Sequence, residues 1–244
     1  MSKIRIMSYN VGHYNMGLST VGFPKEIFNE KVINFKEMLM EYAPDIIGLQ
    51  EDSVYIDQDK TLKSNAYLFE PLWRHRPSNN GSNIRAKFPA YTNTTELIKF
   101  SSSRNYKKTI LKVFGKRLLV ISAHPTAHEG NSAIRKQDYL ELFECAKSET
   151  WDWCIMTGDF NTLEKADKAN LKAICAENEF SMAVGTYLPW VDTFLGRTEK
   201  SKHHSFDNIL CSKNITIKST MILRDWWGRL YSDHVPIVAD VELE

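Results

Sequence analysis

Residues 153–161 read Trp-Cys-Ile-Met-Thr-Gly-Asp-Phe-Asn, an apolar run that ends in polar residues. An apolar run of about four to eight residues beside turn formers is typical of a buried strand. Four further stretches combine an apolar run with polar residues at one end, namely residues 4–10, 45–51, 118–124 and 232–241. Because polar residues at strand ends gather at one edge of a sheet, we expect these five stretches to converge where a ligand can reach them.

The order of the predicted elements indicates an α/β fold. Helices are predicted at residues 25–41, within 53–65, at 131–148 and at 165–178, and strands at 3–10, 45–51, 83–87, 96–101, 109–113, 117–124, 152–158, 204–212, 215–223 and 235–241. Helices alternate with strands early in the chain, whereas hairpin-like pairs crowd its middle and end. This order predicts a four-layer α/β/β/α sandwich, in which two mixed sheets pack face to face and helices flank them.

The composition favours one globular domain. The 244 residues are 43% apolar and 25% charged, close to the globular average, and no linker or repeat divides them. We therefore expect a single domain over residues 1–244. The 31 basic and 30 acidic residues leave a formal charge of +1. This balance neither demands nor excludes a nucleic-acid partner, because a basic cleft can exist without a basic total.

The sequence predicts a cytoplasmic protein. Residues 1–3 lead straight into a predicted strand without the apolar segment of a signal peptide. No apolar run approaches the roughly 20 residues that span a bilayer. The four cysteines, Cys145, Cys154, Cys175 and Cys211, have no paired spacing and mostly lie in apolar segments. We interpret them as buried, reduced thiols, which suit the cytosol, in preference to a metal site formed by the cysteines.

Glu51 and Asn10 end two of the predicted strands and are candidates for a metal site. Mg²⁺ prefers oxygen ligands and combines carboxylates with retained waters. If the two strands are neighbours, these side chains supply a half-open shell for Mg²⁺. The simpler alternative is that Glu51 is a solvated residue at the end of its strand.

Two further pairs of polar residues suggest acid–base chemistry. Asp159 and Asn161 point to the same side of an extended chain. They can orient an attacking water and hold a phosphate oxygen, or they can simply form a turn. His234 has a candidate partner in Asp207, since a buried carboxylate that bonds one imidazole nitrogen makes the other a better base. A surface histidine beside an aspartate is the simpler alternative.

His124 and His128 have the spacing of a zinc pair on a helix. Pro125 argues against a helix at this point, and the sequence offers no third nitrogen or sulfur ligand. A cationic or hydrogen-bonding His124 beside a phosphate fits better. His128 is either a substrate contact or an ordinary loop residue.

Six short motifs together resemble the endonuclease/exonuclease/phosphatase superfamily, the group of pancreatic deoxyribonuclease, abasic-site endonucleases, neutral sphingomyelinases and inositol polyphosphate 5-phosphatases. The motifs occur in the family's order and span nearly the whole chain. They are Met-Ser-Tyr-Asn-Val at 7–11, Pro-Asp-Ile-Ile-Gly-Leu-Gln-Glu at 44–51, Ser-Ala-His at 122–124, Gly-Asp-Phe-Asn at 158–161, Phe-Asp-Asn-Ile-Leu at 206–210 and Ser-Asp-His-Val-Pro at 232–236.

The resemblance implies the four-layer sandwich and a phosphoesterase that depends on Mg²⁺ or Mn²⁺. It also implies metal binding by Glu51, with Asn10 nearby and Asp233 as a metal or water partner. DNA is the substrate that we expect, cleaved by an endonuclease or an exonuclease. The alternative is a phosphatase or phosphodiesterase that acts on a small molecule or a lipid head group, such as a phosphoinositide or a sphingomyelin-like diester.

The resemblance assigns catalytic roles to five residues. Asp159 and Asn161 position water or phosphate. His234, oriented by Asp207, acts as general base or as a phosphate-stabilising imidazole, and His124 acts as an acid or a phosphate contact. A catalytically inactive binding module with the same fold is the competing interpretation. The intact set of acids and imidazoles argues against it, because a binding module has no need to keep all of them.

Three residues are candidates for substrate binding. His124 stands where abasic-site enzymes commonly have tyrosine, which favours the deoxyribonuclease, sphingomyelinase and 5-phosphatase branches, and His128 follows it within the same loop. Arg135 either meets a phosphate or caps its own helix. Trp190 lies in a predicted loop and either stacks on a base or covers an edge of the core.

Overall fold

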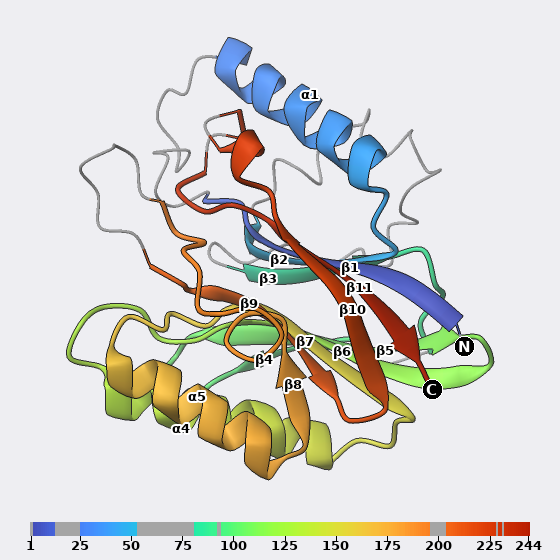
Figure 1. The fold of residues 1–244 in the computed structure, drawn as a ribbon, viewed down its shortest axis with the longest axis vertical. Helices are drawn as coiled ribbons and strands as arrows, with labels where there is room; N and C mark the ends of the chain where they lie inside the picture. Colours follow the sequence, from blue (N-terminus) through green and yellow to red (C-terminus); the bar gives the residue numbers. More distant parts are fainter. Residues whose placement is uncertain are drawn as a thin grey trace.

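The computed structural model describes residues 2–12, 25–52, 81–91, 94–195, 204–227, 229–230 and 232–244. Within them the chain forms two mixed sheets with helices on both outer sides (Figure 1). The predicted four-layer α/β/β/α sandwich is therefore confirmed. The helix predicted within residues 53–65 falls outside the described residues.

In the described part of the chain, the first sheet has five strands in the order β10-β11-β1-β2-β3. Among these strands β1 and β2 run parallel, and the other neighbours are antiparallel. The parallel pair brings the carboxyl ends of two strands, and with them Asn10 and Gln50, into register. The strands are β1 (Ser2–Asn10), β2 (Ile46–Asp52), β3 (Gly81–Ala86), β10 (Ile215–Ile222) and β11 (Ile237–Leu243).

The second sheet, as far as the structure describes it, has six strands in the order β4-β5-β6-β7-β9-β8. Its central pair, β6 and β7, is again parallel, so that His124 and Asp159 end neighbouring strands at the same edge. The strands are β4 (Glu96–Lys99), β5 (Asn105–Val113), β6 (Lys116–His124), β7 (Trp153–Asp159), β8 (Phe180–Met182) and β9 (Asp207–Ser212). The short edge strand β8 was not predicted, since its sequence follows a helix without a turn signal.

Three apolar cores formed by described residues join the four layers. The largest lies between the sheets, and a second lies between the six-stranded sheet and the helices α4 (Ser132–Lys147) and α5 (Lys165–Glu177). The third joins the five-stranded sheet to α1 (Lys25–Tyr42) and the 3-10 turn η1 (Arg224–Trp226). None of the described helices is long and apolar enough to cross a membrane.

Strict alternation along the central strands decides which side chains lie between the sheets. In β1, Ile4 and Ile6 belong to the inner core, whereas Met7 and Tyr9 pack in the core beneath α1. Successive strand residues point to opposite faces. Asn10 therefore lies on the same inner face of β1 as Ile4 and Ile6, just beyond the end of the apolar core.

Two local predictions from the sequence have different outcomes. The residues Phe-Gly-Lys at 114–116 predict a tight hairpin turn, and it is confirmed, with Phe114 and Gly115 at φ values of 48° and 85°, as a two-residue hairpin turn requires. The apolar residues of the helix predicted at 131–148 are expected to face the core, Leu140 among them. For Leu140 this is wrong, because its side chain is exposed and Leu142 is buried instead. Leu142 lies three residues after the buried Tyr139 and so shares its helix face.

Candidate active site

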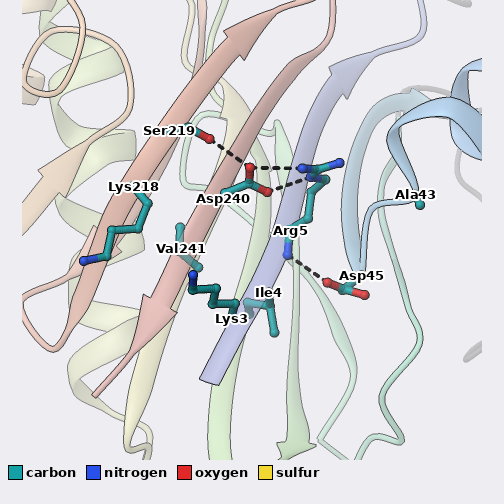
Figure 2. Close-up of a pocket in the computed structure, with 9 residues that line it drawn as sticks. All are labelled: Lys3, Ile4, Arg5, Ala43, Asp45, Lys218, Ser219, Asp240 and Val241. Atoms are coloured by element: carbon teal, nitrogen blue, oxygen red, sulfur yellow. Dashed lines mark hydrogen bonds and ion pairs between the residues drawn. The ribbon is translucent and has the colours of Figure 1, made fainter. Parts of the chain in front are cut away.

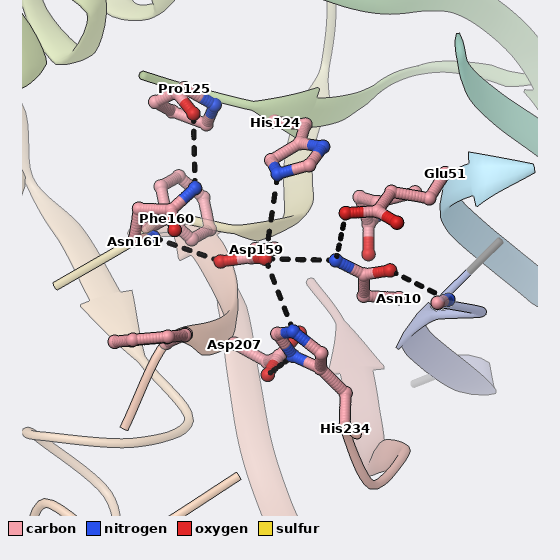
Figure 3. A network of polar contacts seen from close by, with 12 residues as sticks. Asn10, Glu51, His124, Pro125, Asp159, Phe160, Asn161, Asp207 and His234 are labelled. Atoms are coloured by element: carbon pink, nitrogen blue, oxygen red, sulfur yellow. Dashed lines mark hydrogen bonds and ion pairs between the residues drawn. The ribbon is translucent and has the colours of Figure 1, made fainter. Parts of the chain in front are cut away.

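The polar residues at the strand ends meet at one edge of the sandwich, between the two sheets (Figure 3). Asn10, His124 and Asp159 end β1, β6 and β7, and each continues the inward-facing row of its strand. Asp207 opens β9, which runs antiparallel to β7 and pairs with it at Asp159. The sandwich thus brings together side chains that lie far apart in the chain, from Asn10 near its start to His234 near its end.

Glu51 reaches this site through an irregularity that alternation does not predict. Leu49 faces the α1 side of the sheet, so a regular strand would also turn Glu51 toward α1. The pairing of β2 with β3 shifts register between Leu49 and Asp52, and Glu51 has a φ of 53°. This bulge turns the carboxylate back toward Asn10, whose Nδ2 lies 3.5 Å from Glu51 Oε1.

Asp159 lies at the centre of the polar network. Its Oδ2 accepts a hydrogen bond from Asn10 Nδ2 at 2.9 Å and lies 3.5 Å from His124 Nε2 and 3.6 Å from His234 Nε2. Its Oδ1 accepts the backbone N–H of Asn161 at 3.0 Å. All of these residues are buried, so their charges interact in a poorly hydrated environment.

His234 and Asp207 form the pair that the sequence predicts. His234 Nδ1 donates to Asp207 Oδ2 at 2.8 Å, and both side chains are buried. Thr193 fixes the carboxylate's strand, because its Oγ1 accepts the Asp207 backbone N–H at 2.9 Å. Thr193 also holds the segment that carries His234, since its carbonyl accepts the Val235 N–H at 2.8 Å.

The two imidazoles beside Asp159 have opposite protonation preferences. Burial alone would lower the pKa of His234, but the charges of Asp207 and Asp159 outweigh it and raise that pKa to about 10. Burial lowers the pKa of His124 and outweighs the opposing charges of Asp159 and Glu51. At neutral pH His234 is therefore a cation and His124 a neutral imidazole, and such a separation is typical of groups with different roles in proton transfer.

The remaining motif residues lie next to this network. Asn161 has a φ of 49° and donates from Nδ2 to the carbonyl of Pro125 at 3.0 Å, so it joins β7 to the loop after β6. Asp233 is buried, and its Oδ1 lies 3.9 Å from His234 Nε2. Asn10 turns its amide nitrogen toward Glu51 and Asp159 while its oxygen accepts the Gly12 N–H at 2.9 Å. Asn10 thus orients two carboxylates.

A cavity of about 600 Å³ opens beside the network. Its described lining includes six residues of the sequence motifs, together with a loop after β6 that carries His128. The sequence did not indicate the contribution of Phe194, which also lines the cavity. No motif marks Phe194, because it lies in a loop whose position depends on the fold. The motif residues are Glu51, His124, Asp159, Asn161, Phe206 and His234.

Arg135 and Trp190 do not line this cavity in the described structure. Arg135 is completely buried beneath the loop after β6, where it pairs with Asp167 at 2.8 Å and donates to the carbonyl of His128 at 2.6 Å. The guanidinium of Arg135 faces the inside of the protein and forms this ion pair. It is therefore not available for the predicted contact with a phosphate. Trp190 packs against the apolar cores and against Lys168.

Arg135→Met is expected to lower the free energy of unfolding by about 3–5 kcal/mol, because it leaves the buried carboxylate of Asp167 without its cation. Chemical denaturation measures this change. Lys147→Met is the matched control, since Lys147 lies on the same helix in an exposed pair with Glu144, and should cost less than about 1 kcal/mol. If the two variants had equal free energies of unfolding, Arg135 would have no structural role.

A second cavity, of about 430 Å³, lies over β1, β10 and β11 (Figure 2). Its central charges neutralise each other, since Arg5 Nε and Nη2 donate to the two oxygens of Asp240 at 2.6 and 3.0 Å. Asp45 accepts the backbone N–H of Arg5 at 2.8 Å. The lining described for this cavity contains no histidine. Its polar groups therefore stabilise the sheet.

The donor set of the first site fits a divalent metal ion. Among the described residues, four buried carboxylates gather there against two cationic side chains, His234 and Arg104, so a hard cation would neutralise the excess negative charge of this described set. One oxygen or nitrogen atom each of Asp159, Asp207 and His234 lies within 4.8 Å of the others. Because Asp207 and His234 already bond each other, the oxygens of Glu51 and Asp159 are the better donors for such an ion. The carboxylates are Glu51, Asp159, Asp207 and Asp233.

Comparison with known proteins agrees with this geometry. Structures similar over 99% or more of this chain include D. rerio TDP2 complexed with single strand DNA product (20% identity, 100% of that chain, TM-score 0.74) and the human Nocturnin catalytic domain with bound sulfate anion (20%, 95%, 0.66). An endonuclease/exonuclease/phosphatase from Bacteroides vulgatus is 19% identical, with both chains covered completely and a TM-score of 0.70.

At such low identities these likenesses show the shared fold. No curated protein sequence matches the chain. The model of the Endonuclease/Exonuclease/phosphatase family matches residues 7–234, which include all of the strand-end residues described above. The chain therefore belongs to the endonuclease/exonuclease/phosphatase family of phosphoesterases.

Proposed function

We propose that this chain, as a single domain, is a cytoplasmic enzyme that hydrolyses phosphodiester bonds of DNA with Mg²⁺ or Mn²⁺ as its cofactor. The observation that carries the proposal is the meeting of Glu51, His124, Asp159 and the Asp207–His234 pair at one cavity. The four free cysteines support a reducing compartment.

The side chains of the site have different roles in hydrolysis. Asp159 accepts a proton from the attacking water or orients that water, and Asn161 keeps Asp159 in place through its backbone N–H. His234 donates from Nε2 to a phosphate oxygen, since its ring is held and charged by Asp207. This assignment favours the phosphate-stabilising role of His234 over the role of general base. His124 is a neutral imidazole and therefore does not carry an acidic proton to give to the leaving oxygen, which favours its role as a phosphate contact over the role of acid.

Glu51 and Asp159 would hold the metal ion, with Asn10 orienting both carboxylates and Asp233 as a nearby partner. When bound, a divalent ion neutralises charge on the phosphoryl and leaving oxygens. The residues of this chain are arranged for such an ion because the bulge at Glu51 directs a carboxylate to a site that already contains Asp159.

Two observations support DNA as the substrate. A structure of similar fold, D. rerio TDP2, is complexed with single strand DNA product. In this chain, Arg104 lines the cavity, and the described residues give its guanidinium no hydrogen bond or ion pair. Such a group is available to a phosphate of the substrate.

The proposal is tested by an activity screen with Mg²⁺ and Mn²⁺ on plasmid DNA, abasic duplex, single-stranded RNA, inositol phosphates and bis-p-nitrophenyl phosphate. Cleavage of DNA is the expected result. Hydrolysis of the inositol phosphates or of the generic diester without turnover of nucleic acid would replace DNA by the small-molecule or head-group substrate. A protein inactive on every substrate would overturn the proposal.

DNA affinity is expected to fall steeply as salt rises, and Arg104→Gln should reduce the slope of log affinity against log salt by about one. The reason is that each phosphate contact releases counterions. Fluorescence anisotropy with labelled DNA in EDTA measures binding without cleavage. Lys172→Gln, on the exposed face of α5, is the control and should keep the slope. An affinity indifferent to salt would count against a polyanionic partner.

A further inference from the structure

A layer of small polar side chains lies between the two sheets, directly behind the candidate active site. Ser122 and Thr157 continue the inward-facing rows of β6 and β7, just beyond the apolar core. Gly48 of β2 faces them, and a Cβ atom at Gly48 would lie 1.7 Å from Thr157 Oγ1 and 3.3 Å from Ser122 Oγ. Because only a glycine fits at this point, the backbone of β2 comes within reach of a short side chain from the other sheet.

Ser122 bonds β2 across this close approach. Its Oγ donates to the carbonyl oxygen of Leu49 at 3.0 Å and accepts a hydrogen bond from Gln50 Nε2 at 3.0 Å. These two hydrogen bonds form the Ser122 bridge. All three residues are fully buried, so the loss of either bond would leave a buried polar group without its partner. The Ser122 bridge therefore favours a single arrangement of this part of β2.

The Ser122 bridge acts on the residues directly before Glu51. The carbonyl of Leu49 belongs to the peptide bond that leads into Gln50, where the pairing of β2 with β3 begins to shift register. The next carbonyl, that of Gln50, accepts the backbone N–H of Val11 at 3.0 Å. The two peptide units before Glu51 are thus held, one by the facing sheet and one by β1. They set the start of the bulge that turns the Glu51 carboxylate into the cavity.

The two carboxylates that would hold the metal ion belong to different sheets. Glu51 lies near the end of β2 in the five-stranded sheet, whereas Asp159 ends β7 in the six-stranded sheet (Figure 3). Mg²⁺ needs its oxygen ligands at about 2.0–2.1 Å in a near-octahedral arrangement. A small displacement of one sheet against the other would therefore weaken binding, and the Ser122 bridge joins the two sheets one layer behind the carboxylates.

We propose that Ser122 and Gln50 are positioning residues, which place the Glu51 carboxylate opposite Asp159 through the Ser122 bridge. The inference rests on the proposed function, in which these two carboxylates hold Mg²⁺ or Mn²⁺. It extends the machinery of the site into the interior of the sandwich, to two side chains that are not part of the described cavity lining.

Binding of Mn²⁺ to the protein without substrate tests the inference, because electron paramagnetic resonance detects free Mn²⁺ and needs no turnover. Ser122→Ala is expected to raise the Kd for Mn²⁺ on the order of 10-fold, as for other residues that orient metal ligands. Thr157→Val is the matched control, since it removes a hydroxyl of the same layer whose bond to the Ile121 carbonyl stays within one sheet. It should leave the Kd unchanged. Equal Kd values for the two variants would overturn the inference.

Gln50→Met tests the second hydrogen bond, because it keeps the length of the side chain and removes the amide. It should also raise the Kd for Mn²⁺, and the double variant should bind little more weakly than Ser122→Ala alone, since both residues act through one bridge. Additive losses would overturn the inference. If thermal melting shows that Ser122→Ala does not fold, Gln50→Met replaces it, and a wild-type Kd for Gln50→Met would then contradict the positioning role.

Hydrogen exchange separates this inference from the proposed function. Mass spectrometry of the metal-free proteins compares amide exchange in residues 46–52, which we expect to be several-fold faster in Ser122→Ala than in Thr157→Val. If the wild-type protein binds no Mn²⁺, the proposed metal-dependent function fails, and faster exchange in Ser122→Ala still supports the placement of Glu51 by the Ser122 bridge. Equal exchange in the two variants would overturn that placement even in a protein that binds Mn²⁺.

Discussion

His234→Ala is expected to lower kcat on the order of 10³–10⁴-fold, and Asp207→Asn should lower it by a similar factor. The double variant should be little slower than His234→Ala alone. The reason is that Asp207 acts through the imidazole, which it holds at 2.8 Å and keeps protonated. Once the ring is absent, its carboxylate partner has no further effect on the rate.

Turnover and chemical denaturation, measured together on the three variants, separate this account from a purely structural role. Asp45→Asn is the matched control, because Asp45 also accepts a backbone N–H but lies away from the cavity. It should lower stability and leave the rate per folded molecule unchanged. Additive rate losses for Asp207→Asn and His234→Ala, or a loss of stability without a loss of rate, would rule out a functional Asp–His pair.

Glu51→Gln is expected to lose activity on the order of 10²–10³-fold at low metal concentration and to recover part of it as Mg²⁺ or Mn²⁺ is raised. The amide keeps the size of the side chain but removes the charge that attracts a hard cation. Glu41→Gln, an exposed residue of α1, is the control and should leave the metal titration unchanged. An unaltered metal dependence of Glu51→Gln would exclude Glu51 from the metal site.

The bulge at Glu51 supplies a second reason to expect this large effect. A non-glycine residue at a φ of 53° is held in an unfavourable conformation. Backbone strain of this kind persists where the surrounding structure over-determines it and often coincides with function. The strain here has a direct result, because it brings the Glu51 carboxylate to the side of Asn10 and Asp159.

Much of the fold follows from the sequence because the strands alternate regularly. Apolar residues two apart predict the inner faces of β1, β6 and β7, and the same parity leads to Asn10, His124 and Asp159. The strand-end positions of these residues therefore follow from local pattern. Their approach to within hydrogen-bonding distance depends on the packing of two sheets, and only the family's motifs predict it.

The parts that escape prediction depend on local exceptions or on distant partners. The alternation along β2 predicts that Glu51 faces α1, but the bulge turns its side chain to the opposite face of the sheet. In the sequence, Arg135 is a cation without an evident partner. The structure places Asp167, more than thirty residues later, beside it. Phe194 lies in a segment without periodic pattern, and its place at the cavity depends on pairing with His204 and His234.

The most direct measurement of the central claim is hydrolysis of plasmid DNA by the wild-type protein after treatment with EDTA, before and after Mg²⁺ is returned in excess. His234→Ala, purified in parallel, shows whether a contaminating nuclease is present. The account predicts no cleavage in EDTA, restored cleavage with Mg²⁺, and little or none by His234→Ala under either condition. Cleavage that persists in EDTA, or that is equal for the two proteins, would contradict a metal-dependent centre built on the residues around Asp159.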